Sequence, residues 1–277
     1  MKNNILEINN LKVFPNNNSR LKLVKNISLS LKKGKTTCIV GESGSGKSLT
    51  ALSVMQLLSS QLSMSGNIVF EDINLLKLTK EEMRKRRGKD IAMIFQEPMT
   101  SLNPVLTIGY QIEEAVGVHE NLIKTELNKR VEELLNIVGI PTDRINSYPD
   151  ELSGGQRQRV MIAMAISCSP KLLIADEPTT ALDVTVQAQI LNLLNDLKLK
   201  FQMTMLFITH DFGVVDDIAD DVAVMYQGEI VEQGRVLNVL KNPKHPYTKA
   251  LLGCVPDPQG KKDLKPIDYS ALKRAMG

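Results

Sequence analysis

The chain has 277 residues, 43% of them hydrophobic, which is enough to bury the core of one large domain or of two smaller ones. Its formal net charge is +3, from 34 Lys and Arg against 31 Asp and Glu, so the overall charge gives no reason to expect nucleic acid as a partner. The three cysteines lie far apart, which argues against a zinc site or a disulfide framework. Residues 1–10 lack the pattern of a signal peptide, and no run approaches the roughly 18 apolar residues of a membrane span, so neither is expected.

The chain is expected to begin with two strands. Apolar residues alternate in part over 5–13 and again over 21–31, and the turn-forming residues 15–18 lie between them. Phe14 follows the first strand, where its ring could stack on an adenine base or could belong to the core. A β-rich region therefore precedes the rest of the chain.

Residues 41–48 match the phosphate-loop pattern G-x-x-x-x-G-K-[ST] between a strand predicted at 36–40 and a helix predicted at 49–58. The glycines let successive backbone N–H groups turn toward phosphate oxygens at a helix N-terminus. Lys47 would contact the β and γ phosphates, and the Ser48 hydroxyl would bind Mg²⁺. We therefore predict a nucleoside triphosphate site made by Gly41, Glu42, Ser43, Gly44, Ser45, Gly46, Lys47 and Ser48.

Further strands are predicted at 66–70 and 91–95. The basic run 84–87 between them is interpreted as a solvated helix face or a loop, in preference to a nucleic-acid patch. Pro98 ends the second strand, and Gln96 comes just before it. The Gln96 amide could reach a magnesium ion or an attacking water, although a loop glutamine is by default a surface residue.

Helical periodicity over 106–138 predicts a helical insert. A second glycine-rich helix start follows it, where backbone N–H groups and a serine hydroxyl could again bind an anion. The loop at 41–48 already encloses one triphosphate. A two-fold head-to-tail pair of chains would therefore present this second start to the partner's nucleotide through Ser153, Gly154, Gly155 and Gln156.

An apolar strand is predicted to end in the carboxylates of Asp176 and Glu177. We expect Asp176 to bind Mg²⁺ and Glu177 to act as the general base that polarises a water toward the γ phosphate. The strand predicted at 204–209 ends at His210, at the same edge of a parallel sheet as Asp176 and Gln96. Its neutral imidazole could bond to the γ phosphate.

In order along the chain, these features resemble the ATP-binding cassette (ABC) family. The resemblance covers roughly residues 1–240, and its most specific element is the signature Leu-Ser-Gly-Gly-Gln at 152–156; the turn at 180–183 adds Asp183 as a nucleotide contact. A narrower similarity, to the ATPase subunits of bacterial dipeptide, oligopeptide and nickel importers, is carried by 95–104, 176–183 and 242–252.

The resemblance implies an α/β phosphate-loop NTPase (RecA-like) core with an antiparallel β subdomain and an inserted α-helical subdomain. The expected domains are the nucleotide-binding core at 1–96 and 165–240, the helical signature subdomain at 97–164, and a short C-terminal extension at 241–277. Longer peptide-importer members carry a cysteine-rich extension. Only Cys254 follows residue 240 here, so no iron–sulfur cluster is expected.

The family also implies the ligands ATP and Mg²⁺ and a peripheral position on the cytoplasmic face of the cell membrane. The implied partners are a second ABC ATPase subunit, paralogous or identical, two membrane permeases contacted through Gln96 and the loop after it, and indirectly an extracytoplasmic solute-binding protein. The sequence leaves open which solute is transported, and the import direction depends on the resemblance alone.

Two other functions are alternatives to that of an importer ATPase. A soluble ABC ATPase without a membrane partner commonly carries two cassettes or a long coiled-coil insert, whereas one cassette with a short insert is expected here. A phosphoryl-transfer kinase would use the phosphate loop on a small acceptor, and the signature at 152–156 argues against it.

Overall fold

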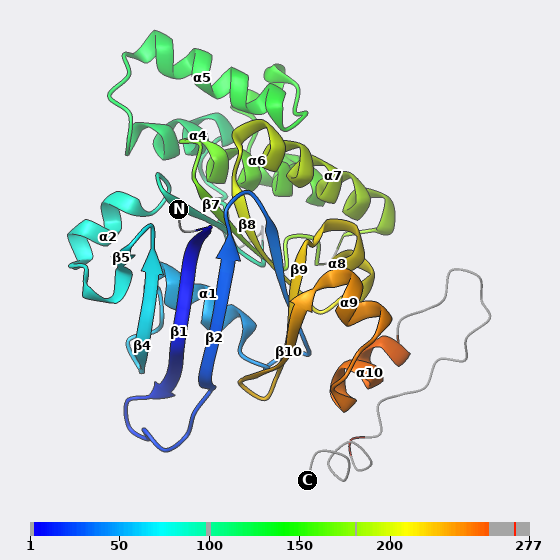
Figure 1. The fold of residues 1–277 in the computed structure, drawn as a ribbon. Helices are drawn as coiled ribbons and strands as arrows, with labels where there is room; N and C mark the ends of the chain where they lie inside the picture. The colour runs from blue at the N-terminus through cyan, green and yellow to red at the C-terminus, as the bar shows by residue number, and fades with distance from the viewer. Residues whose placement is uncertain (1–2, 98–100, 181, 255–268, 270–277) are drawn as a thin grey trace. The chain divides into compact units, whose positions relative to one another are not determined.

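The computed structural model describes residues 3–97, 101–180, 182–254 and 269 (Figure 1). It forms two compact units, the first made of residues 1–77 and 206–277 and the second of residues 78–205. Pro98, Ala181 and most of the C-terminal extension expected at 241–277 lie outside the described residues. Among the helices that are described, none combines the length and the apolar character needed to span a membrane.

The first unit contains an antiparallel sheet with the strand order β2-β1-β4-β5 (Figure 1). Along β2 buried and exposed residues largely alternate, as expected for a sheet with one face on the core. This sheet confirms the antiparallel β subdomain. Its strands are β1 (Asn4–Pro15), β2 (Val24–Lys32), β4 (Leu62–Phe70) and β5 (Ile73–Asn74), and a 3₁₀ turn, η1 (Leu75–Lys77), follows them.

The same unit holds strands in the order β10-β9-β3-β8, with β3 and β9 parallel and β9 and β10 antiparallel. All residues of β3 and β8 are buried, which is typical of the interior strands of an α/β sheet. The strands are β3 (Thr36–Val40), β8 (Thr204–Thr209), β9 (Asp221–Tyr226) and β10 (Glu229–Arg235), and the helices are α1 (Lys47–Met55), α8 (Phe212–Ile218), α9 (Val236–Lys241) and α10 (Pro246–Gly253).

The second unit pairs two parallel strands, β6 (Ile91–Ile94) and β7 (Leu172–Asp176), and surrounds α6 (Gly154–Ile166) with other helices. Helix α6 contacts β6 and three helices, because its buried residues occupy several sides of it. The remaining elements are α2 (Lys80–Arg86), α4 (Ile108–Gly117), α5 (Lys124–Ile137), α7 (Val184–Phe201) and the 3₁₀ turns η2 (Thr142–Asn146) and η3 (Pro149–Glu151).

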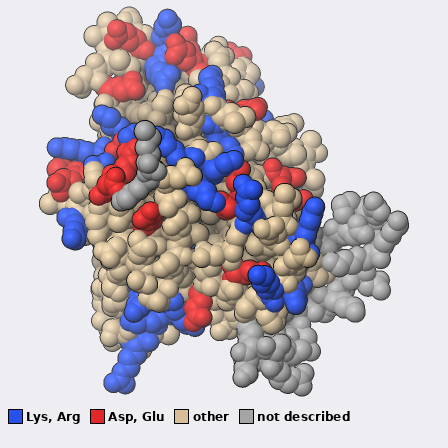
Figure 2. All heavy atoms as spheres, in the orientation of Figure 1, with Lys and Arg blue, Asp and Glu red and all other residues tan. Residues whose placement is uncertain are grey.

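The predicted strands at 36–40 and 204–209 are confirmed as β3 and β8, and the helical insert is confirmed as α4 and α5. The helix predicted at 49–58 instead begins at Lys47 and ends at Met55, because Gln56 takes a left-handed conformation with φ 50°. The basic run 84–87 lies at the end of α2, in agreement with the helix-face interpretation. On the face shown in Figure 2, Lys and Arg lie intermingled with Asp and Glu.

The carboxylate of Glu232 on β10 fixes the start of α10. Its oxygens accept hydrogen bonds from the backbone N–H groups of Lys244 (2.8 Å) and His245 (2.9 Å). Desolvation raises the pKa of Glu232, but the neighbouring Thr248 hydroxyl and these two N–H bonds outweigh it, so the pKa is lowered. A lowered pKa in the folded state means that the carboxylate form stabilises the fold.

Replacing Glu232 with Gln is expected to lower the free energy of unfolding by about 1 kcal/mol at neutral pH, since one charged acceptor is lost. The stabilisation is present above the ordinary glutamate pKa of 4.5 and is lost as the pH falls through the lowered pKa, so the two proteins converge in acid. Urea unfolding at several pH values measures this. The control Glu229→Gln removes an exposed carboxylate 3.5 Å from Lys25 and should change little; an equal loss would contradict the assignment.

Candidate nucleotide site

The phosphate loop joins β3 to α1 in the first unit, as the sequence predicts. Gly46 caps α1 with φ 104°, a left-handed conformation that favours glycine. At Gly41 an added Cβ would collide with the backbone carbonyl oxygen of Met225 on β9. Both positions therefore require glycine for the loop to keep this path against β9.

Lys47 lies almost fully buried under the loop, at 4% exposure. Its Nζ donates hydrogen bonds to the carbonyl oxygens of Gly41 (2.7 Å) and Glu42 (2.9 Å). The ammonium is thus held at the centre of the loop by the loop itself. Ser43 and Gly44 are exposed on the other side, where Glu42, Ser43, Gly44, Ser45 and Gln227 help to line a cavity of about 270 Å³.

In the second unit the structure brings Gln96 and Glu177 together. They follow the paired strands β6 and β7, and Gln96 Nε2 donates to Glu177 Oε2 at 3.1 Å. Thr180 Oγ1 donates to the same oxygen at 2.9 Å. Asp176, the last residue of β7, is buried at 4% exposure. The hydrogen bonds from Gln96 and Thr180 therefore fix the orientation of the Glu177 carboxylate, which directly follows Asp176 in the sequence.

Glu177 also has an unusual backbone, with φ 47°. A non-glycine residue in this left-handed region costs on the order of 1 kcal/mol. Such strain is commonly found at functional sites, because the surrounding structure has to hold it. Sequence reasoning placed a carboxylate here but could not foresee this conformation.

His210 and Phe14 belong to the first unit. His210 directly follows β8 and is exposed. Phe14, near the end of β1, is half-buried, and Lys22 Nζ lies 4.0 Å from its ring centroid. The ring is therefore no member of the buried core, which was the alternative interpretation of Phe14.

The signature residues form the N-terminus of α6. Ser153 caps the helix: its Oγ accepts from the Gln156 N–H at 3.2 Å, and Gln156 Oε1 accepts from the Ser153 N–H at 2.9 Å. This capping box was visible in the sequence as Ser-x-x-Gln and was missed there. The first N–H groups of a helix, here those of Gly154 and Gly155, have no acceptor within the helix, so the site still suits an anion.

Gly155 has a packing role that its neighbour lacks. A Cβ at Gly155 would come within 2.6 Å of Val186 Cγ1 on α7, whereas at Gly154 the nearest atom, Leu182 Cδ2, would be 3.6 Å away. Gly155→Ala is expected to destabilise the chain by about 1–2 kcal/mol, because Val186 must move, while Gly154→Ala should be neutral or slightly stabilising. Urea unfolding of the matched pair tests this; equal effects would show that α6 and α7 do not pack this closely.

Asp183 is the N-cap of α7, where its Oδ1 accepts from the Val186 N–H at 2.9 Å. The sequence predicts a nucleotide contact at this residue, and the structure adds the role of helix cap. An aspartate before a helix of apolar periodicity is a cap signal, and this one was overlooked.

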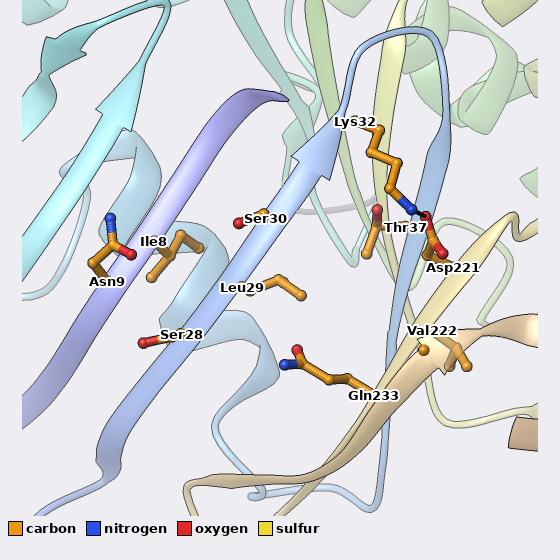
Figure 3. Close-up of a pocket in the computed structure, with 11 residues that line it drawn as sticks. Ile8, Asn9, Ser28, Leu29, Ser30, Lys32, Thr37, Asp221, Val222 and Gln233 are labelled. Carbon is orange, nitrogen blue, oxygen red and sulfur yellow. Dashed lines mark hydrogen bonds and ion pairs between the residues drawn. The ribbon is translucent and has the colours of Figure 1, made fainter. Parts of the chain in front are cut away.

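Another cavity in the first unit, of about 290 Å³, contains none of the predicted site residues. In Figure 3 the ion pair of Lys32 and Asp221, 2.9 Å long, lies beside Thr37. Thr37 is near the start of β3, whereas the phosphate loop follows the end of that strand. This cavity is thus separate from the nucleotide loop.

Comparison with protein families gives two matches. Residues 24–180 match the family described as "ABC transporter", and residues 231–275 match "Oligopeptide/dipeptide transporter, C-terminal region". The first match covers the phosphate loop, Gln96, the signature and the acidic pair.

The curated relatives include transport proteins of similar sequence. The oligopeptide transport ATP-binding protein OppD of Bacillus subtilis (strain 168) is 49% identical over 95% of this chain and 75% of its own length. AppD of the same organism, also an oligopeptide transport ATP-binding protein, is 51% identical over 94% and 80%. The glutathione import ATP-binding protein GsiA of Escherichia coli (strain K12) is 50% identical over 96% of this chain and 44% of its own length.

Two solved structures with a similar fold are each 28% identical to this chain in sequence. The dimeric post-hydrolysis state of the ATP-binding cassette MJ0796 bound to ADP and Pi aligns with a TM-score of 0.75 over 83% of this chain and 98% of that one. CbiO1 from Clostridium perfringens, part of the transporter complex cbiONQ, gives a TM-score of 0.75 over 87% and 92%.

Proposed function

Because this chain belongs to the ABC transporter family and is an ATPase, we propose that it is the ATP-hydrolysing subunit of a bacterial importer for peptides. The relatives reported above are named for oligopeptides and for glutathione, itself a small peptide. The C-terminal match at 231–275 is to a family named for the same solutes. Each of these relatives is named for transport or import and none is named for nickel, so peptides are preferred over nickel chelates and over the soluble alternative.

We assign the loop Gly41–Ser48 to the phosphates of ATP, with Lys47 on the β and γ groups. The donors assigned to Mg²⁺, the Ser48 hydroxyl, the Asp176 carboxylate and the Gln96 amide oxygen, are oxygen ligands that fit this ion. When bound, Mg²⁺ neutralises charge that develops on the phosphate oxygens. The adenine would stack on Phe14, and His210 would bond to the γ phosphate.

Glu177 is assigned as the general base. Hydrogen bonds from Gln96 and Thr180 to Oε2 orient its carboxylate. A carboxylate held in this way can accept a proton from a water that attacks the γ phosphate, a role worth about 10² to 10⁴ in rate. This fixed carboxylate is the observation that supports hydrolysis most directly.

A second ATPase subunit, paralogous or identical, would complete the site. Ser153, Gly154, Gly155 and Gln156 lie at a helix start suited to an anion and are assigned, with Asp183, to the partner's ATP. The similar cassette MJ0796 is described as a dimer bound to ADP and Pi, which supports such a pairing. Closure on ATP and reopening after hydrolysis would then drive transport.

Two membrane permeases are proposed to dock on the helical region, for which we retain the boundaries 97–164. Val105 is 74% exposed and Tyr110 is 51% exposed, and Tyr110 lines a cavity of about 420 Å³ with residues of α4 and α5. Exposed side chains such as these suit contact with a helix of a partner protein. In this proposal the chain would lie at the cytoplasmic face of the membrane, and an extracytoplasmic binding protein would supply the peptide.

Peptide uptake in source cells lacking this chain tests the proposal. We expect uptake of a labelled oligopeptide or dipeptide to be lost, to return with the wild-type chain and not to return with Glu177→Gln. Labelled nickel, free and chelated, is measured in parallel. A nickel deficit with normal peptide uptake would overturn the assignment of peptides, and no deficit in either would overturn the importer assignment.

A further inference from the structure

A residue of the C-terminal region reaches the phosphate loop from 205 positions away. The backbone N–H of Glu42 donates a hydrogen bond to the hydroxyl oxygen of Tyr247 at 3.1 Å. Tyr247 lies on α10 and is fully buried at 0% exposure. Its ring lies against that of Tyr226, with centroids 4.2 Å apart and planes inclined by 37°. The hydroxyl is thus presented to the loop by a side chain with almost no freedom of its own.

The start of α10 is itself tied down. Glu232 accepts from the N–H groups of Lys244 and His245, and His245 Nδ1 accepts from the Tyr247 N–H at 3.2 Å. Burial raises the pKa of the Tyr247 hydroxyl, so the group is neutral at physiological pH. The position of this acceptor is therefore set by packing and by backbone hydrogen bonds together.

Glu42 also forms hydrogen bonds through its other polar atoms. Its carbonyl oxygen accepts from Lys47 Nζ at 2.9 Å, and its Oε1 accepts from the hydroxyl of Tyr269. Both the backbone N–H and the side chain of this one loop residue are thus bonded by tyrosines of the C-terminal region. Ser43 and Gly44, which follow it, are exposed.

We propose that Tyr247 is a positioning residue for the phosphate loop, which it holds in its binding-competent shape through the backbone N–H of Glu42. The inference rests on the proposed ATP site and assigns to the C-terminal region a role in nucleotide affinity. A loop that is already ordered loses less conformational entropy when it closes around phosphates. Without the hydroxyl, the Glu42 N–H loses its acceptor and the loop has more conformations to give up on binding.

Equilibrium ATP binding by the full chain tests this with the pair Tyr247→Phe and Tyr226→Phe. Both changes keep a ring and remove one hydroxyl, but that of Tyr226 accepts from the Gln227 side chain. Tyr247→Phe is expected to raise the ATP Kd about fivefold to tenfold with unchanged stoichiometry. Tyr226→Phe should stay within about twofold. An unchanged Kd, or a lower stoichiometry at the same Kd, would mean that Tyr247 only supports folding and would overturn the inference.

Hydrogen exchange of the Glu42 amide in the wild-type, nucleotide-free chain gives an independent measurement that needs no variant. We expect this amide to be protected relative to those of exposed Ser43 and Gly44. Exchange as fast as theirs would overturn the inference even if Tyr247→Phe fails to fold. A wild-type chain that binds no ATP would overturn the proposed function, whereas wild-type binding that Tyr247→Phe matches would overturn the role of Tyr247 alone.

Discussion

Replacing Glu177 with Gln is expected to lower steady-state ATP hydrolysis by a factor of about 10² to 10⁴, the contribution of a general base. The side chain keeps its size, and its Oε atom can still accept the bonds from Gln96 and Thr180 that reach one oxygen of Glu177. Folding and ATP binding should therefore be preserved. What the variant loses is the capacity to take a proton from water.

The same variant is expected to accumulate in an ATP-bound dimer or complex, because in the proposed mechanism closure would need ATP and reopening would need hydrolysis. Phosphate release measures the rate, and light scattering with and without ATP measures assembly. The control Glu133→Gln removes one negative charge from an exposed pair with Arg130, 3.5 Å long, and should keep the full rate. If Glu177→Gln retained more than about a tenth of the wild-type rate and did not assemble on ATP, another group would have to be the base.

Local patterns predicted much of the nucleotide region. The strand predicted at 36–40 agrees with β3 residue for residue, and all five of its residues are buried. The prediction was possible because the phosphate-loop motif comes directly after a strand. The sequence also predicts that Gln96 and Asp176 lie at one edge of a parallel sheet, since each comes at the end of an expected strand. That β6 and β7 are neighbours, and that Gln96 bonds to Glu177 81 positions away, is seen only in the structure. The strand and the phosphate loop depend on residues within a few positions of one another, whereas this pairing does not.

Some helices were not predicted, although the sequence carries a signal for them. Helix α7 has buried residues at Ile190, Leu194 and Leu197 after an Asp183 cap, which is helical spacing that went unused. In contrast, no local pattern indicates that Tyr247 meets Glu42, 205 positions earlier in the chain. Contacts of this range depend on the register of α10 and on the packing beneath the loop, which sequence periodicity does not contain.

Lys47→Ala is expected to weaken ATP binding about 100-fold, equivalent to about 2.7 kcal/mol. Charge-assisted bonds to phosphate are among the strongest that a side chain makes. Part of this gain is offset, since the ammonium must first leave the carbonyl oxygens of Gly41 and Glu42. The expected loss of ATP affinity is therefore smaller than it would be for an ammonium that had no other hydrogen-bond partners before the triphosphate bound.

The nucleotide series separates the charge of Lys47 from its structural role. Because Lys47 is assigned to the β and γ phosphates, the loss of affinity should be largest for ATP, smaller for ADP and close to none for AMP. Calorimetric titration of the three nucleotides measures this, with exposed Lys33→Ala as the control for one lost positive charge. An equal loss for AMP would mean that the loop collapses once the ammonium is removed from beneath it. Lys47 would then act mainly by holding the shape of the loop, as Tyr247 is proposed to do through Glu42.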